Sequence, residues 1–187
     1  MKRRYDISGG YALIIAALCL ALAAPSLAVQ NSADAFMSLP FGHPFKRTQL
    51  RMERSGATVL TPREESLTME GWFEGRPAVF SFGFHRKKGL NAKGVYIQST
   101  GDGKKDEQFY RLLKRGYEAR FGSGRETAVP NTWKEGRIMD QCAWTPDRWT
   151  TITLTYNAEV RERFPGRSMK DRPIHLLYSY SKWDEVK

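Results

Sequence analysis

Cysteine and histidine are scarce in this sequence, and their scarcity excludes several kinds of site. The two cysteines among the 187 residues are Cys19 and Cys142. Cys19 lies in an apolar N-terminal run, so the rest of the chain holds a single cysteine, which cannot close an internal disulfide. The three histidines, His43, His85 and His175, lie far apart and lack the spacing of metal ligands. We therefore expect no metal site and no cofactor, and we interpret Cys142 as a small buried apolar residue.

Recognisable catalytic motifs are also absent. The sequence contains no Gly-x-Ser-x-Gly element of a hydrolase nucleophile and no His-Glu-x-x-His element of a zinc protease. Residues 101–105 lack the spacing of a phosphate-binding P-loop and are interpreted as a solvated turn. Glu64-Glu65 and Asp106-Glu107 are adjacent carboxylates without the separation of a catalytic pair, and we interpret them as surface and helix-end charge. The sequence therefore favours a protein without catalytic residues.

The N-terminus has the three-part order of a secretory signal peptide. A positive segment, Lys2-Arg3-Arg4, is followed by an apolar run over residues 11–24 and by a small-x-small sequence that ends at Ala28. We expect residues 1–28 to be removed after Sec-dependent export, which would leave no stable transmembrane span. A retained membrane anchor is the alternative, because residues 11–29 approach the length of a spanning helix. Both interpretations place the rest of the chain outside the cytoplasm, in the periplasm of a Gram-negative bacterium.

Beyond the signal peptide the pattern predicts one α+β domain. Residues 29–38 are expected to form a flexible leader, and the domain itself covers residues 39–187. Helices are expected at 45–54 and 106–121. Strands are expected at 57–60, 67–73, 78–84, 90–98, 137–144, 149–156 and 174–180. We expect an antiparallel sheet with the helices packed on one face. The order of elements also hints at two α-β-β-β repeats, with halves at 39–100 and 101–187.

The clearest strand and the clearest helix define the expected core. In strand 78–84 every second residue is apolar, and three of these residues are phenylalanines. Helix 106–121 carries apolar side chains at steps of three and four: Phe109, Leu112, Leu113, Tyr117 and Phe121. In the weaker helix at 45–54, Leu50 and Phe45 are expected to face inward. The expected common core comprises Phe80, Phe82, Leu113, Tyr117, Ile152 and Leu154.

Short motifs give the chain a resemblance to known proteins. Pro40-Phe41-Gly42 forms a turn before the first helix, and Phe121-Gly122 ends the second helix after a central meander. Over residues 39–156 this order resembles a loose group of small, mostly uncharacterised exported bacterial envelope proteins with an α+β fold. The resemblance implies a fold and a compartment, and it assigns no functional residues.

Positive charge beyond the signal peptide favours anionic partners. The residues after Ala28 carry 27 basic and 19 acidic side chains, a net charge of +8. The expected partner is an envelope protein or an anionic envelope component, and the location argues against nucleic acid. Simple solubility is an equal explanation of the charge. The expected contacts are the basic residues of two predicted loops: Arg86, Lys87, Lys88, Arg161, Arg163, Arg167, Lys170 and Arg172.

The leading hypothesis is therefore a non-catalytic periplasmic binding or accessory protein. One alternative is an envelope hydrolase in which a carboxylate meets His43 or His85; the candidate carboxylates are Glu64, Glu65, Glu70 and Asp140. A second alternative is a structural subunit that self-associates through exposed strand edges or through Cys142. The sequence leaves the oligomeric state open.

Cleavage after Ala28 is the first testable prediction. Signal peptidases require small residues at the positions of Ser26 and Ala28, so protein purified from the periplasm should lack residues 1–28. Intact-mass measurement of the purified protein decides the point. A mass that includes residues 1–28 would instead identify the segment as a retained anchor.

Overall fold

The computed structural model describes residues 31–130, 138–157 and 172–183. The chain divides into two units, Met1–Gln30 and Asn31–Lys187, and the fold described below belongs to the second. The predicted signal peptide and its cleavage site lie outside the described residues. Among the helices of the described part, none combines the length and the apolar character needed to cross a bilayer.

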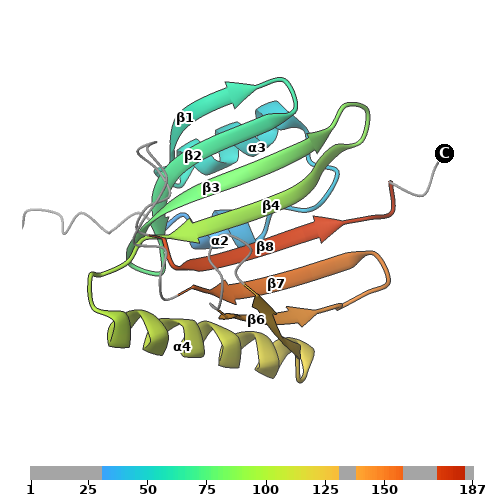
Figure 1. The fold of residues 1–187 in the computed structure, drawn as a ribbon. Coiled ribbons are helices and arrows are strands. Elements are labelled where there is room, and N and C mark those ends of the chain that lie inside the picture. The colour runs from blue at the N-terminus through green and yellow to red at the C-terminus, as the bar shows by residue number, and fades with distance from the viewer. Residues whose placement is uncertain (1–30, 131–137, 158–171, 184–187) are drawn as a thin grey trace, which may run out of the picture. The chain divides into compact units, whose positions relative to one another are not determined.

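An eight-stranded antiparallel sheet forms the framework of the described residues (Figure 1). The strands lie in the order β1-β2-β3-β4-β8-β7-β6-β5, so two consecutive meanders meet where β4 pairs with β8. Their bounds are β1 Thr58–Arg63, β2 Ser66–Phe73, β3 Arg76–His85, β4 Gly89–Ile97, β5 Arg125–Pro130, β6 Ile138–Trp144, β7 Thr150–Tyr156 and β8 Ile174–Tyr180. The predicted antiparallel sheet is confirmed.

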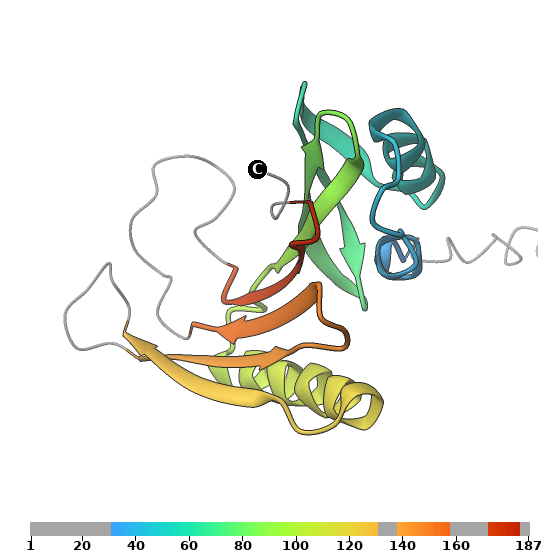
Figure 2. The ribbon, with the colours of Figure 1, turned by 90° about the vertical axis from the view of Figure 1, so that its right-hand side faces the viewer.

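Three helices of the described part pack on one face of this sheet: α2 Ala33–Met37, α3 Phe45–Arg54 and α4 Gly103–Phe121. Phe36 of α2 places its ring 5.4 Å from that of Phe80 on β3 and 5.9 Å from that of Tyr178 on β8. Tyr117 of α4 lies 5.3 Å from the ring of Trp144 on β6. Figure 2 shows α2 and α3 side by side on this face. The predicted α+β class, with helices on one face, is therefore confirmed.

The predicted core is largely the observed one. Phe80, Phe82, Ile152 and Leu154 are buried on the helix-covered face, and Tyr117 packs against them. Leu113 is only partly buried at the edge of this cluster. The alternation of apolar and small residues along a strand thus identified the correct face of the sheet, because successive side chains of a strand point to opposite sides.

Each half of the sheet follows the same order of elements. A helix precedes four antiparallel strands in both halves, α3 before β1–β4 and α4 before β5–β8. The expected repeat had three or four strands in its first half and three in its second, and β5 is the strand that the sequence did not predict. As an edge strand, β5 pairs only with β6, so its sequence needs little of the alternation that marks a central strand.

The segment expected to be a flexible leader is instead ordered from Asn31 onward and contains α2. The backbone N–H of Ser32 donates a hydrogen bond to the carbonyl of Trp72 at 2.8 Å, and Phe36 is fully buried among core aromatic rings. A helix of five residues is too short to be stable alone, so its order comes from these tertiary contacts.

Two leucines expected to face inward are exposed instead. The bounds of α3 match the predicted helix, but α3 buries Thr48 and Met52, and Leu50 is 50% exposed. Leu112 of α4 is 56% exposed, although it belongs to the apolar stripe of that helix. The apolar stripe of α4 is wider than the part of the helix that packs against the sheet, so the side of the stripe with Leu112 stays exposed to solvent.

Phe82 provides a test of the core assignment. The ring has no solvent exposure, so Phe82→Ala should lower the free energy of unfolding by about 3–5 kcal/mol. Leu112→Ala is the matched control on an exposed position and should change stability by less than about 1 kcal/mol. Urea denaturation measures both, and equal losses in the two variants would contradict the assigned core.

Candidate functional site

A mostly apolar groove runs along α4 in the described part of the chain. It has a volume of about 470 Å³ and lies between α4, the end of α2 and the turn after β2. Most of the lining is apolar, and the side chains are Met37, Phe73, Glu74, Phe109, Leu112, Leu113, Tyr117 and Arg120, with Gly116 among them. These α4 positions recur every three or four residues and therefore form one face of the helix.

The two charged residues of the groove lie at opposite ends. Phe109 and Arg120 are separated by about 16 Å along the axis of α4, from the rise per residue. Phe73 pairs with Arg76 across the β2–β3 turn, and the guanidinium of Arg76 lies 4.1 Å from the centre of the Phe109 ring. Glu74, which follows Phe73, therefore lies at the Phe109 end, far from Arg120.

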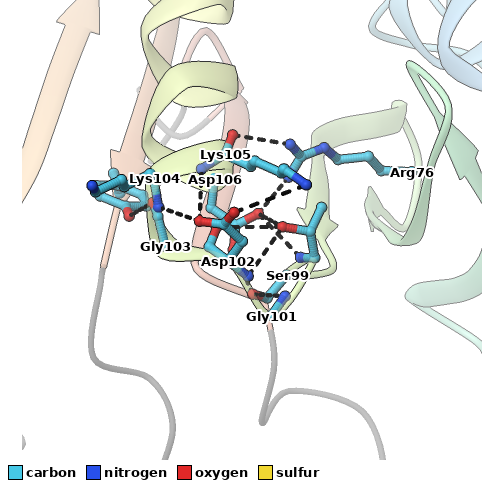
Figure 3. A network of polar contacts seen from close by, with 10 residues as sticks. Arg76, Ser99, Gly101, Asp102, Gly103, Lys104, Lys105 and Asp106 are labelled. Atoms are coloured by element: carbon cyan, nitrogen blue, oxygen red, sulfur yellow. Dashed lines mark hydrogen bonds and ion pairs between the residues drawn. The ribbon is translucent and has the colours of Figure 1, made fainter.

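A buried ion pair fixes the N-terminal end of α4 (Figure 3). Arg76 Nη1 lies 2.6 Å from Oδ1 of Asp106, and Arg76 Nη2 donates to the carbonyl of Lys105 at 3.1 Å. The Asp106 carboxylate also accepts hydrogen bonds from the hydroxyl of Ser99 and from the N–H and hydroxyl of Thr100. Asp106 is 2% exposed, which corrects its interpretation as a surface charge.

The electrostatics of this network favour an ionised carboxylate. Burial alone would raise the pKa of Asp106, but the hydrogen bonds from Ser99, Thr100 and Arg76 outweigh burial and hold the pKa below its ordinary value. The segment 101–105, expected to be a solvated turn, begins the helix: Asp102 accepts hydrogen bonds from the backbone N–H groups of Lys104 and Lys105. Both carboxylates thus position α4.

A buried lysine fixes the other wall of the groove. Nζ of Lys93, on β4, donates to the carbonyls of Phe36, Met37 and Leu39 at 2.8, 3.0 and 2.9 Å. These carbonyls end α2 and the turn after it, so the ammonium satisfies groups that a helix terminus leaves without partners. Lys93 is 5% exposed and forms no ion pair with a described carboxylate.

Aromatic rings complete the surroundings of this ammonium. Nζ of Lys93 lies 5.2 Å from the centre of the Phe36 ring and 5.0 Å from that of Tyr178, which are cation–π distances. Burial, with smaller contributions from the charges of Arg120 and Arg51, lowers the pKa of Lys93 to about 8. Lys93 was not predicted as a site residue, although it shares the inward face of β4 with Val95 and Ile97.

Two tyrosine hydroxyls connect Lys93 with the groove. The hydroxyls of Tyr117 and Tyr178 hydrogen-bond to each other, and they lie 3.4 and 3.1 Å from Sδ of Met37. Burial raises the pKa of both, that of Tyr178 to about 12, so both are neutral at physiological pH. Tyr117 and Met37 belong to the groove lining, whereas Tyr178 and Lys93 lie behind it.

Gly116 keeps part of the groove open. It lies in the middle of α4, where glycine costs about 1 kcal/mol relative to alanine. A Cβ at this position would meet no described atom within 4 Å, and the backbone does not have the positive φ that favours glycine. No contact within the described residues therefore requires a glycine here.

The predicted basic sites are only partly brought together. Arg86, Lys87 and Lys88 lie at the β3–β4 turn and line a second pocket of about 350 Å³. Glu64 and Glu65 line the same pocket, and Glu65 Oε1 lies 3.4 Å from Nε of Arg86, so acidic neighbours offset much of the positive charge. The remaining predicted contacts are elsewhere: Arg172 lines a third pocket with Trp72 and Gln98, and Arg161, Arg163, Arg167 and Lys170 lie outside the described residues.

The residues proposed for a hydrolase are also divided. Glu64, Glu65 and His85 share the β3–β4 pocket, whereas Glu70 lines the third pocket and Asp140 lies on β6. Nδ1 of His43 lies 3.2 Å from the hydroxyl of Thr48. No group of three potential metal ligands occurs within the part of the chain that the structure describes. Hydrolase activity stays an untested prediction.

Cys142 is a free, fully buried cysteine. Burial raises the pKa of its thiol, which suppresses the reactive thiolate. Its position on the helix-covered face of β6 agrees with the interpretation as a small apolar residue.

Comparison with known proteins gives no relative from which a role could be transferred: no family model, no curated protein and no solved structure matches the chain.

The buried ammonium of Lys93 should make stability depend on pH. Its pKa is about 8 in the folded state and 10.5 in the unfolded state, so between these pH values the unfolded chain binds more protons. The free energy of unfolding contributed by Lys93 should therefore rise with pH across this window, by up to about 3 kcal/mol.

The variant Lys93→Met isolates this effect. The tyrosines and the other lysines titrate equally in both proteins, so their effects cancel in the comparison. From pH 7.5 to 10.5 the unfolding free energy of wild type should therefore rise relative to that of Lys93→Met. Urea denaturation at each pH provides the measurement. Two parallel pH profiles would show that Lys93 has the same pKa folded and unfolded.

Proposed function

We propose that the chain is an exported, non-catalytic binding protein of the bacterial periplasm that takes up an anionic component of the cell envelope. We further propose that the groove along α4 is its binding site. The signal-peptide pattern supports the location, and the net charge of +8 beyond residue 28 supports an anionic ligand.

The groove is the observation that carries the proposal. Its volume of about 470 Å³ lies within the usual range for small-molecule sites, which are mostly apolar with few polar groups. Both walls are held by buried charges, α2 by Lys93 and α4 by Asp106. A site whose walls are already fixed loses little conformational entropy when a ligand binds.

The polar groups of the groove suit binding better than catalysis. Its charged members, Glu74 and Arg120, lie at opposite ends and cannot act on one bond together. The tyrosine hydroxyl of Tyr117 is neutral, because burial raises its pKa. A general base and a nucleophile within hydrogen-bond reach of each other are therefore missing from the described lining.

The basic turn at Arg86, Lys87 and Lys88 contributes at longer range in this proposal through the positive charge that Glu64 and Glu65 leave uncompensated. Exposed positive charges increase the rate of encounter with anionic surfaces, and salt screens this attraction over about 8 Å at physiological ionic strength. The basic residues at 161–172 add to the net positive charge of the chain.

Recovery of bound material from envelope extract tests the proposed site. We expect protein lacking residues 1–28 to retain a component of a Gram-negative envelope extract that mass spectrometry detects after washing. Gly116→Trp should lose it, because the indole fills the groove, and Gly116→Ala should keep it. Circular dichroism controls for the fold.

Equal recovery from wild type and Gly116→Trp would contradict the groove as the binding site. Conversion of the recovered component into products by wild type would contradict a non-catalytic role.

A further inference from the structure

The lining of the groove fits an extended apolar chain better than a peptide. Leu112 and Leu113 offer only carbon atoms, and Gly116 leaves space where a side chain would stand. A bound peptide brings backbone N–H and C=O groups that need partners, and a helix face offers none because its own backbone groups are already bonded. An acyl chain has no such requirement, so it can lie along α4 without leaving polar groups unsatisfied.

Positive charge gathers at one end of this apolar surface. Arg120 lines the groove together with Met37, whose carbonyl accepts a hydrogen bond from Lys93. Arg51 donates to the hydroxyl of Ser38, the residue after Met37, so the three cations share one region. Within the described residues, none of the three forms an ion pair with a carboxylate. The donors of Lys93 are already engaged by carbonyls, and Arg51 is not part of the groove lining. Arg120 does line the groove, with its guanidinium 5.1 Å from the centre of the Phe121 ring, so it is the cation that can reach a ligand.

The opposite end of the groove has the opposite charge. Glu74 follows Phe73 in the β2–β3 turn, and the guanidinium of Arg76 on the other side of that turn covers the Phe109 ring. Phe109 lies about 16 Å along α4 from Arg120. An anionic head group is therefore attracted to the Arg120 end and repelled from the Glu74 end. A guanidinium binds carboxylate and phosphate oxygens through charge-assisted hydrogen bonds, which are stronger than bonds between neutral groups.

We propose that the groove binds a single-chain anionic amphiphile, with its acyl chain along α4 and its carboxylate or phosphate head group at Arg120. This inference rests on the proposed function and names the ligand class of the same site. The chain lies over Leu113 and Leu112 toward Phe109, and the neutral hydroxyl of Tyr117 lies on the side of the head group.

Titration calorimetry with defined probes tests the ligand class. The protein lacking residues 1–28 is titrated with dodecyl phosphate, dodecanoate, dodecyltrimethylammonium and inorganic phosphate, each below its micelle concentration. We expect dodecyl phosphate and dodecanoate to bind about tenfold or more tightly than the ammonium probe. Their binding should show a negative heat-capacity change, the mark of apolar burial. Inorganic phosphate should bind far more weakly.

Two pairs of variants separate the head group from the chain. Arg120→Gln should weaken dodecyl phosphate by about tenfold without weakening the ammonium probe, whereas Arg115→Gln, on an exposed residue outside the groove, should change neither. Gly116→Leu and Gly116→Trp should abolish binding of both amphiphiles, and Gly116→Ala should retain it. Helical circular dichroism confirms that each variant is folded.

Several outcomes would overturn the inference. Equal affinity for the phosphate and ammonium amphiphiles would remove the role of Arg120, and inorganic phosphate binding as tightly as dodecyl phosphate would remove the role of the acyl chain. If no amphiphile binds but Gly116→Trp still loses a protein or peptide from envelope extract, the ligand class is wrong and the proposed binding site stands. If Gly116→Trp changes neither measurement, both proposals fail.

Discussion

Three hydrogen bonds from the ammonium of Lys93 to the carbonyls of Phe36, Met37 and Leu39 hold the helical layer to the centre of the sheet. Burying a charge is costly unless polar partners replace water, and here backbone carbonyls and two aromatic rings take that place. The short helix α2 has no stability of its own at five residues. The position of α2 therefore depends on Lys93 and on the buried ring of Phe36. The same contacts fix Met37, which forms part of the groove wall.

Asp106 fixes α4, the other wall of the groove. The buried charges of Asp106 and Lys93 differ in whether an opposite charge neutralises them. The carboxylate of Asp106 is neutralised by Arg76 and satisfied by Ser99 and Thr100, so it leaves little field beyond its network. Lys93 has only neutral partners among the described residues, so its charge is not cancelled. The same arrangement that fixes the walls thus leaves positive potential near Arg120.

The sequence predicted what depends on periodicity and missed what depends on single residues. Alternation located the inward faces of β3 and β7, and the spacing of apolar residues located α4. The bounds of α3 were predicted correctly but its buried face was not, because α3 buries Thr48 and Met52 and exposes Leu50. It could not reveal α2, because five residues carry no periodic signal and their order comes from the Phe36 ring. The apolar stripe of α4 predicted an apolar helix face, but it could not predict which residues of that face the sheet would cover. The sheet covers Tyr117, whereas Leu112 lines the exposed groove. Lys93 on the inward face of β4 was a second sign of the site in the sequence, and it was missed.

The groove itself arises where the two halves of the molecule differ. α3 and α4 each precede a four-stranded meander, and β4 and β8 join the meanders at the centre of the sheet. α2 precedes α3 and has no counterpart in the described second half. Its Phe36 ring lies over both halves, against Phe80 of β3 and Tyr178 of β8, so it fills the centre between the two longer helices. At five residues against the 19 of α4, it reaches that helix through Met37 and Tyr117 and leaves the apolar positions nearer Phe109 uncovered. The groove therefore lies where Met37 of α2 and Phe73 of β2 border α4 while Leu112 stays 56% exposed.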